Sequence, residues 1–322
     1  MQTAKRVFYI VVAFGLVLGA LWYGIFSLKT QVVSSEQLAQ RYGMDNRVPT
    51  LHLEPLEAGA FALSFDSYDG QKVVGQISLP TDATGPYPVM LGLHAMGRSY
   101  PRWWTDSLRG SPTLTHVNDI TEHANRLGYA VIALDARYHG ERKDPDMDLF
   151  KIMRNLHLWG DRAAYEDMIV GTVKDYRLLI NALAVDPRFD LGHLVATGYS
   201  MGAQMSLLLA GHDPRITGVV SIVPPYLDDT MAVVAPKNAV AKIQQAKVLM
   251  IVADDDEHAD VEDSRAVFEA IPGRHNRFHV ATGGHILPDN YVQTVADWLQ
   301  QQRLNLSPLA GHHEGAASNG AD

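Results

Sequence analysis

The chain has 322 residues, of which 47% are hydrophobic and 20% charged, and its formal net charge is −9. This composition is typical of a globular protein and excludes collagen-like and low-complexity sequences. Because there is no cysteine, the chain can hold no disulfide, no cysteine-ligated metal and no thiol nucleophile. The negative charge argues against a nucleic-acid partner, since phosphate backbones attract basic surfaces.

The N-terminal segment is apolar enough to be a transmembrane helix. Residues 7–28 contain no charge and no proline, and at ~1.5 Å per residue a helix of this length would span about 33 Å. Lys5 and Arg6 precede it, and aromatic side chains lie near its ends: Phe8, Tyr9, Trp22 and Tyr23. We therefore expect one transmembrane anchor over residues 7–28, with residues 1–6 in the cytoplasm and the remainder on the periplasmic or extracytoplasmic side.

Two other interpretations of this segment remain. A cleaved signal peptide usually has an apolar run of ~7–15 residues that ends at a small-x-small site. Here the run is longer, and bulky side chains stand where small ones are needed: Leu18, Leu21 and Ile25. A buried helix of a soluble protein is the third possibility. We favour the uncleaved anchor.

The rest of the chain divides by composition. Residues 29–50 are polar and only weakly periodic, which predicts a stalk. Residues 51–305 have the pattern of one domain. Residues 306–322 are rich in Gly, Ala, Ser and His, so we expect a disordered tail, in which His312 and His313 are solvated and bind no metal.

The domain begins with a predicted β-hairpin and continues as alternating strands and helices. Residues 60–67 and 72–79 alternate in polarity around the turn Tyr68-Asp69-Gly70, as the two strands of a hairpin do. Short apolar runs then predict strands at 89–93, 130–134, 194–197, 218–223, 248–252 and 277–281. Helices are predicted at 117–127, 163–183, 201–210, 260–270 and 290–301. Unbroken apolar strands that alternate with helices indicate an α/β fold, with a mainly parallel sheet covered on both faces.

A nucleophile motif follows the predicted strand at 194–197. The sequence Gly198-Tyr199-Ser200-Met201-Gly202 is a G-x-S-x-G pattern between a buried strand and an apolar helix. At such a turn the serine occupies a strained backbone position that exposes its hydroxyl. The flanking glycines are needed because side chains there would collide with the neighbouring strand and helix.

A serine nucleophile needs a base, and the base needs an acid that orients it. His285, in a glycine loop after the strand at 277–281, is the candidate base. The strand at 248–252 is followed by several carboxylates that compete for the acid: Asp254, Asp255, Asp256 and Asp260. All follow carboxyl ends of predicted strands, as Ser200 does, and in a parallel sheet these ends share one edge.

The same residues give little support to a metal site. Three adjacent carboxylates cannot all point at one ion, and the glycine of a calcium-binding loop is missing. His94 and His139 have no acidic or histidine partner at a ligand spacing, so we expect each to hydrogen-bond a backbone turn. Asp135 and Arg137 are expected to fix the turn beside His139. We predict no metal and no cofactor.

The chain resembles the α/β-hydrolase superfamily, and within it the serine-esterase and dienelactone-hydrolase-like branch. The resemblance extends over about residues 61–301. Four motifs carry it, in chain order: His94-Ala95-Met96-Gly97, the run from Asp135 to Arg142, Gly198-Tyr199-Ser200-Met201-Gly202, and Gly284-His285. It implies the α/β-hydrolase fold and a Ser-His-Asp triad.

The resemblance also assigns the acid and the oxyanion hole. In the family the acid stands three residues past a glycine that ends its strand; Ala253 stands in that place here and points to Asp256. The oxyanion hole would be the backbone N–H groups of Met96 and Met201. Where the family turn reads His-Gly-x-x-Gly, this chain has Ala95 in place of the first glycine.

We therefore expect a membrane-anchored serine hydrolase that cleaves small carboxylic esters through an acyl-enzyme. Residues 224–245 are too few for a large lid, which argues against a long-chain lipase. Aromatic side chains near the catalytic edge are candidates for substrate contact: Trp103, Trp104 and Tyr199. The alternatives are a peptidase or amidase of the same fold, and a catalytically silent binding protein.

Overall fold

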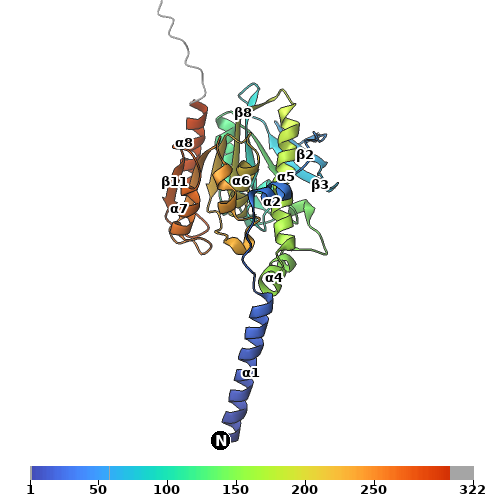
Figure 1. Ribbon diagram of the computed structural model, residues 1–322. Coiled ribbons are helices and arrows are strands. Elements are labelled where there is room, and N and C mark those ends of the chain that lie inside the picture. Colours follow the sequence, from blue (N-terminus) through green and yellow to red (C-terminus); the bar gives the residue numbers. More distant parts are fainter. Residues whose placement is uncertain (1, 58, 305–322) are drawn as a thin grey trace, which may run out of the picture.

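The computed structural model describes residues 2–57 and 59–304, in which nine strands form one sheet. The strand order is β1-β2-β3-β7-β4-β8-β9-β10-β11 (Figure 1). The first four are β1 (His52–Pro55), β2 (Ala60–Asp66), β3 (Lys72–Ser78) and β4 (Tyr87–Leu93). The others are β7 (Ala130–Leu134), β8 (Phe189–Tyr199), β9 (Gly218–Ile222), β10 (Lys247–Ala253) and β11 (Arg277–Ala281).

The sheet is antiparallel at one edge and parallel elsewhere. Strands β1, β2 and β3 pair antiparallel, as does β3 with β7, whereas β7, β4, β8, β9, β10 and β11 run parallel. The predicted hairpin and the predicted mainly parallel sheet are therefore confirmed. Because the parallel strands share one direction, their carboxyl ends meet at one edge, where sites form.

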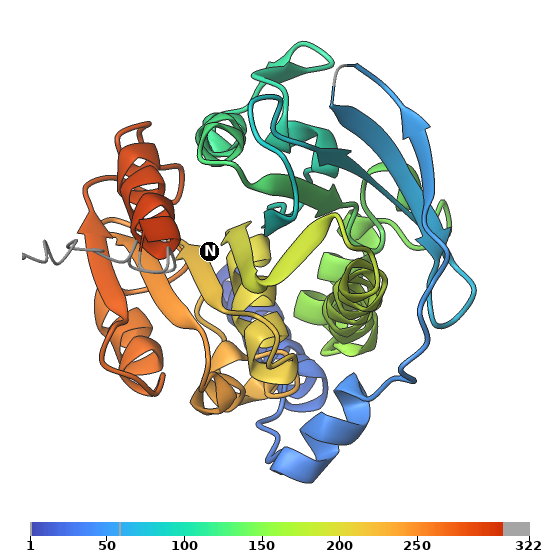
Figure 2. The same ribbon diagram turned by 90° about the horizontal axis from the view of Figure 1, so that it is seen from above.

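Helices cover both faces of the sheet, as Figure 2 shows from above. On one face lie α3 (Val117–Arg126) and α8 (Tyr291–Leu304), and the other carries α5 (Ala163–Ala184), α6 (Met201–His212) and α7 (Val261–Glu269). Three segments for which the sequence predicted no helix or strand contain such elements. They are α2 (Ser35–Tyr42), α4 (Leu149–Trp159) and the short pair β5 (Ser107–Leu108) and β6 (Ser111–Pro112).

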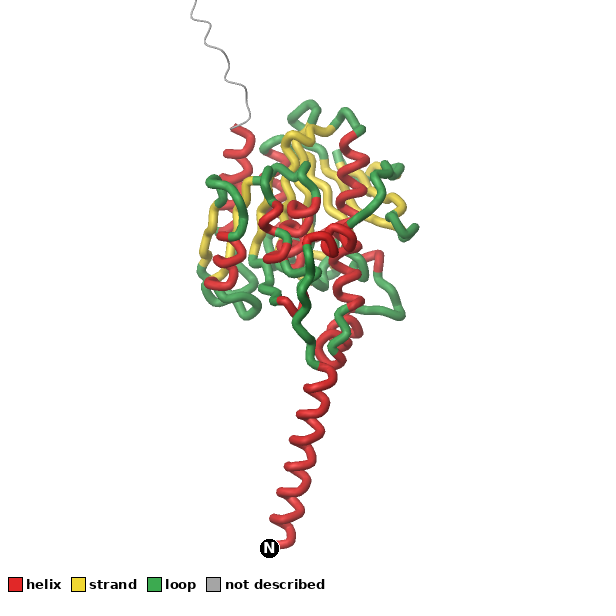
Figure 3. Tube along the Cα trace, viewed as in Figure 1, coloured by secondary structure: helices red, strands yellow, loops and turns green. Residues whose placement is uncertain are grey.

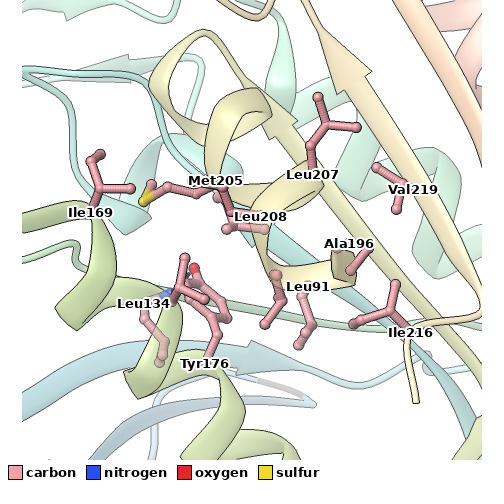
Figure 4. Close-up of a cluster of buried hydrophobic side chains, with 14 of the residues drawn as sticks. Leu91, Leu134, Ile169, Tyr176, Ala196, Met205, Leu207, Leu208, Ile216 and Val219 are labelled. Atoms are coloured by element: carbon pink, nitrogen blue, oxygen red, sulfur yellow. Dashed lines mark hydrogen bonds between the residues drawn. The ribbon is translucent and has the colours of Figure 1, made fainter. Parts of the chain in front are cut away.

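The main core lies between β4, β8 and β9 and helices α5 and α6. It contains Leu91, Ala196, Val219, Ile169, Leu207 and Leu208, all fully or almost fully buried (Figure 4). Helix α6 is mostly apolar and is buried from Met201 to Gly211, as expected for a helix that protein covers all round. Tyr176 closes this core, because its hydroxyl donates to the Gly92 carbonyl (2.6 Å) and accepts from the Leu134 N–H (3.0 Å).

The expected stalk is in part a helix packed on the domain. Ser34 and Gln37 form a capping box that starts α2, and Leu38 and Tyr42 are buried. The Tyr42 ring stacks on His212 at the end of α6, with 3.9 Å between ring centroids. The buried face of α2 consists of one apolar pair, Leu38 and Tyr42, four residues apart. A single pair is too weak a pattern to predict a helix from the sequence.

Helix α1 (Gln2–Phe26) lies outside the folded body, as Figures 1 and 3 show. Its stretch Lys5–Phe26 has 22 residues and a mean hydropathy of 2.1, and none of it is buried against the rest of the protein. The helix is long and apolar enough to be a membrane span or a signal sequence. The expected tail, residues 306–322, lies outside the described residues.

The contact between Tyr42 and His212 predicts a pH dependence of stability. Burial lowers the pKa of His212 from 6.5 to about 3, so the folded protein resists protonation that the unfolded chain accepts. The stabilisation is full above pH 6.5 and is lost as the pH falls toward 3. His212→Phe keeps the stacked ring and should reduce the loss of unfolding free energy between pH 7 and 5 by up to about 2 kcal/mol.

Urea unfolding of the full chain in detergent micelles measures this effect. The matched control is His275→Phe, at an exposed position, which should leave the pH slope unchanged. An equal slope in the wild type and in His212→Phe would contradict the prediction.

Candidate active site

Ser200 stands at the sharp turn between β8 and α6. Its backbone angles are φ 56° and ψ −118°, a region that costs a non-glycine residue of order 1–3 kcal/mol. The turn is held from the side by a hydrogen bond from the Ser200 N–H to the Ile222 carbonyl (2.9 Å). The strained turn places the serine side chain beyond the carboxyl end of β8, as the motif predicts.

The two glycines of the motif are required by close backbone contacts. A Cβ on Gly198 would lie 2.0 Å from the Gly202 carbonyl oxygen in α6, and a Cβ on Gly202 would lie 1.9 Å from the Leu93 carbonyl oxygen at the end of β4. Contacts this short cannot exist without backbone movement. The glycines therefore allow α6 to start directly against the sheet.

His285 lies between Ser200 and Asp256. Its Nε2 is 2.7 Å from Ser200 Oγ, and its Nδ1 is 3.0 Å from each carboxylate oxygen of Asp256. The side chains of His285 and Asp256 are 13% and 2% exposed. The structure thus brings together the three residues that the sequence selected, from the ends of β8, β10 and β11.

The competing carboxylates have different positions. Asp254 Oδ1 accepts a hydrogen bond from the Gly283 N–H (2.9 Å), and Glu257 Oε2 accepts one from the His285 N–H (3.3 Å). Both carboxylates therefore bind the backbone of the loop that follows β11 and carries His285, the histidine loop. The exposed Asp255 contributes its own N–H to the Gly283 carbonyl (3.0 Å). Asp260 precedes α7 and makes no side-chain capping hydrogen bond there. Among the four aspartates, Asp256 is the one that meets the imidazole.

Tyr199 forms hydrogen bonds to the backbone of the histidine loop. It does not line the cavity that opens beside Ser200 and is described below. Its hydroxyl donates to the His285 carbonyl (2.8 Å) and accepts from the Leu287 N–H (2.9 Å). Burial raises the pKa of Tyr199 to about 12, so the hydroxyl keeps its proton and its donor function. Sequence reasoning expected this residue to touch substrate, but the structure places it in the support of His285.

The two tryptophans are also part of the packing. Trp103 is fully buried, and its ring covers Gly92, where an added Cβ would lie 2.6 Å from the indole. Trp104 packs against the buried cluster that contains Trp103, on the sheet face covered by α3 and α8, and its ring meets Tyr100 edge to face. Neither lines the cavity beside Ser200. Their loop borders a separate cavity of about 320 Å³, which has Arg98 in its wall.

The residues expected to form the oxyanion hole lie beside Ser200. Met201 is the first residue of α6, where backbone N–H groups have no partner within the helix. Met96 and Met201 line one cavity together with Ser200. His94 fixes the loop before Met96: its Nε2 accepts from the Ala136 N–H (2.9 Å) and its Nδ1 contacts the Ala95 carbonyl (2.9 Å).

The buried side chains of His94 and His139 each contact backbone atoms of a turn, as expected from the sequence. Burial lowers the pKa of His94 to about 3 and that of His139 to about 4, which keeps both rings neutral. His139 Nδ1 lies 2.8 Å from the Arg137 carbonyl, and the Asp135 carboxylate accepts from the Glu141 N–H (2.8 Å). Over residues 2–57 and 59–304, no cluster of three or more histidines and acidic residues could hold a metal.

A largely apolar cavity of about 340 Å³ opens beside Ser200. Its wall comes from the two expected oxyanion residues, from α4 and α5, and from the loops after β9 and β10: Met96, Met201, Met153, Leu156, His157, Tyr165, Pro225, Tyr226, Leu227, Met231 and His258. Sequence reasoning missed the contribution of α4. The signal was present in Ile152, Met153 and Leu156, whose spacing is helical.

Comparison with known proteins identifies the family of the chain. The family model described as "Dienelactone hydrolase family" matches residues 107–282. The chain belongs to the dienelactone hydrolase family. No match is found among curated proteins.

Solved structures similar to this dienelactone hydrolase family member include several esterases. Acetyl xylan esterase 1 from a Thermoanaerobacterium species has a TM-score of 0.66 at 17% identity, over 84% of this chain and 95% of that chain. An acetyl xylan esterase from a Paenibacillus species has a TM-score of 0.63 at 14% identity, over 85% and 97%. Est1E from Butyrivibrio proteoclasticus, with ferulic acid bound, has a TM-score of 0.52 at 15% identity, over 74% and 96%. At these identities the likeness shows the α/β-hydrolase fold.

The contact at Gly202 generates a testable prediction. Gly202→Ala forces the start of α6 away from Leu93 and should lower the free energy of unfolding by about 1–3 kcal/mol, the usual cost of overpacking. Chemical denaturation of the full chain in micelles measures it. Gly192→Ala is the control, because Gly192 is exposed and its nearest neighbour is the flexible Asp190 side chain. Equal stability of the two variants would show that the turn has room for a methyl group.

Proposed function

We propose that this member of the dienelactone hydrolase family is a membrane-anchored serine hydrolase that cleaves small carboxylic esters. The observation that carries the proposal is the position of His285, within hydrogen-bond distance of both Ser200 Oγ and Asp256. Ester hydrolysis through such a triad requires no metal and no cofactor.

In the first half of the reaction, His285 Nε2 accepts the proton of Ser200 as Oγ attacks the ester carbonyl. The carbonyl oxygen becomes negative and receives hydrogen bonds from the N–H groups of Met96 and Met201. The tetrahedral intermediate collapses when His285 gives its proton to the leaving alcohol, and the acyl group remains on Ser200.

In the second half, water replaces the alcohol. His285 takes a proton from the water, the hydroxide adds to the acyl carbonyl, and the bond to Ser200 Oγ breaks as Oγ recovers its proton. Asp256 accepts the Nδ1–H bond throughout, which fixes the ring orientation and stabilises the imidazolium. The nearly complete burial of Asp256 strengthens this interaction, because little water screens it.

The cavity supports esters with compact acyl or alcohol groups. Its wall is mostly apolar and its volume is about 340 Å³, near the lower end of ordinary ligand sites. The structural neighbours named as acetyl xylan esterases act on acyl esters by their names, which supports ester chemistry here. A peptidase or amidase, and a binding protein without catalysis, are the outcomes against which the proposal is tested.

The anchor supports an extracytoplasmic active site. Helix α1 would cross the membrane, and Lys5 and Arg6 before it favour a cytoplasmic N-terminus. The folded domain would then lie on the periplasmic or extracytoplasmic side.

Removal of the nucleophile tests the proposal directly. Ser200→Ala should lower kcat/KM for p-nitrophenyl acetate by at least about 10³-fold and abolish labelling by a fluorophosphonate, while far-ultraviolet circular dichroism stays unchanged. Ser107→Ala, at an exposed position, should keep both activities. Wild-type protein that takes no label would favour a silent binding protein, and preference for amides over esters would favour a peptidase.

The choice of Asp256 as the acid gives a second test. Asp256→Asn should lower kcat by about 10⁴-fold, because the amide cannot stabilise the imidazolium and favours the wrong tautomer. Asp255→Asn is the matched control one residue away, and it should retain activity within about twofold because its side chain is exposed. Comparable losses in the two variants would remove Asp256 from its assigned role.

A further inference from the structure

Helix α4 presents apolar side chains to solvent close to the active site. Phe150 is 74% exposed, Leu158 is 46% exposed and Trp159 is 49% exposed. Phe150 and Leu158 lie two helical turns apart with the exposed Arg154 between them, so they share one face. The helix Leu149–Trp159 contains Lys151 and Arg154 and no acidic residue. Basic residues beside bulky apolar ones are typical of helices that lie in a membrane surface.

The carboxyl end of α4 meets the end of α1. The rings of Phe26 and Trp159 pack edge to face, with 5.0 Å between centroids. Gly160 ends α4 so close to α1 that a Cβ on it would lie 2.3 Å from the Phe26 carbonyl oxygen. Trp22 packs on Phe26 one turn earlier. Tryptophan favours the membrane interface, so the end of α4 lies where α1 would leave the bilayer.

The chain that follows α1 is attached to the rim of the cavity. The Gln31 N–H donates to the Asp229 carbonyl (2.8 Å). The Arg162 guanidinium donates to the Lys29 carbonyl (3.0 Å) and to the Thr230 carbonyl. Asp229 and Thr230 belong to the loop whose neighbours Leu227 and Met231 line the Ser200 cavity. These bonds fix the exit of the anchor next to the cavity.

Side chains of α4 next to its exposed apolar residues form part of the cavity wall. Met153, Leu156 and His157 line the cavity, while Phe150 and Leu158 do not. Figures 1 and 3 show α1 and α4 at the same end of the molecule, with α5 running from there to the opposite end. Strand β8 returns along the sheet and ends at Ser200. The catalytic edge therefore faces the side from which α1 projects.

We propose that α4 rests in the membrane surface through Phe150 and Leu158, so that the Ser200 cavity opens against the bilayer and receives esters dissolved in the membrane. This inference rests on the proposed hydrolase function and on α1 as an anchor. The substrate class is an amphiphilic ester whose apolar part partitions into lipid. An apolar cavity at the membrane surface would take such a molecule without passage through water.

The position of α4 can be measured independently of activity. The chain has no cysteine, so a single introduced thiol accepts an environment-sensitive fluorophore at one site. Phe150→Cys and Leu158→Cys place it on the proposed membrane face. Val185→Cys is the matched control, because Val185 is 66% exposed and follows the far end of α5.

The measurement uses the full chain in phosphatidylcholine and phosphatidylglycerol vesicles. Labels at positions 150 and 158 should shift to the blue and be quenched by brominated lipid, whereas the label at 185 should show neither effect. Labels at 150 and 158 that are as accessible to water as the label at 185 would overturn the proposal. Covering of these sites by a second copy or another protein would give a blue shift without lipid quenching and would also overturn it.

The second measurement concerns substrate delivery. The double variant Phe150→Glu with Leu158→Glu should hydrolyse vesicle-embedded dodecyl acetate, whose acyl group is compact, at least about tenfold more slowly, because charged side chains withdraw α4 from the lipid. Its rate on water-soluble p-nitrophenyl acetate should stay within about twofold. Val185→Glu should change neither rate. Equal effects on both esters, or on neither, would contradict delivery from the membrane.

The two proposals fail in distinguishable ways. If the wild type hydrolyses neither ester, the hydrolase function is wrong, and the fluorescence measurement still decides whether α4 lies in the membrane. If the wild type hydrolyses both esters and the labels on α4 remain in water, the hydrolase function stands and the membrane-facing cavity is wrong.

Discussion

The contact between the start of α6 and the ends of β4 and β8 is the constraint on which the rest of the site depends. Gly198 and Gly202 allow backbone atoms to approach to distances that a Cβ would prevent, and Ser200 adopts a positive φ between them. The cost of this turn is offset by the burial of α6, which is mostly apolar and packed within the main core. The strained backbone of Ser200 and the position of its side chain are thus consequences of one packing arrangement.

The histidine loop is held by several independent contacts. Asp254 and Glu257 bind its backbone N–H groups, Tyr199 binds the His285 carbonyl, and Asp256 binds the imidazole. Because the backbone and the ring are fixed separately, the imidazole is oriented before any substrate arrives. Such preorganisation lowers the reorganisation that a reaction requires.

Helix α1 and the cavity are linked through α4 and the loop after β9. One side of α4 carries Met153 and Leu156 to the cavity, and its end packs against Phe26 of α1. Arg162 joins the chain after α1 to the same loop. An N-terminal helix in this arrangement would do more than attach the domain to a membrane, because it would also set the direction in which the active site opens.

The sequence by itself determined the hydrolase fold, the apolar N-terminal helix and the grouping of Ser200, His285 and a nearby carboxylate. These follow from strong local patterns, since buried parallel strands are continuous apolar runs and their carboxyl ends share an edge. The family resemblance had already pointed to Asp256 among these carboxylates, and the tertiary structure places it against the imidazole. Tertiary structure alone decided that Trp103, Trp104 and Tyr199 support the packing, and that α2 and α4 are helices. The physical reason is that each of these depends on contacts with residues distant in sequence. Neighbouring carboxylates look alike locally, and a short helix is stable only against a surface that the rest of the chain supplies.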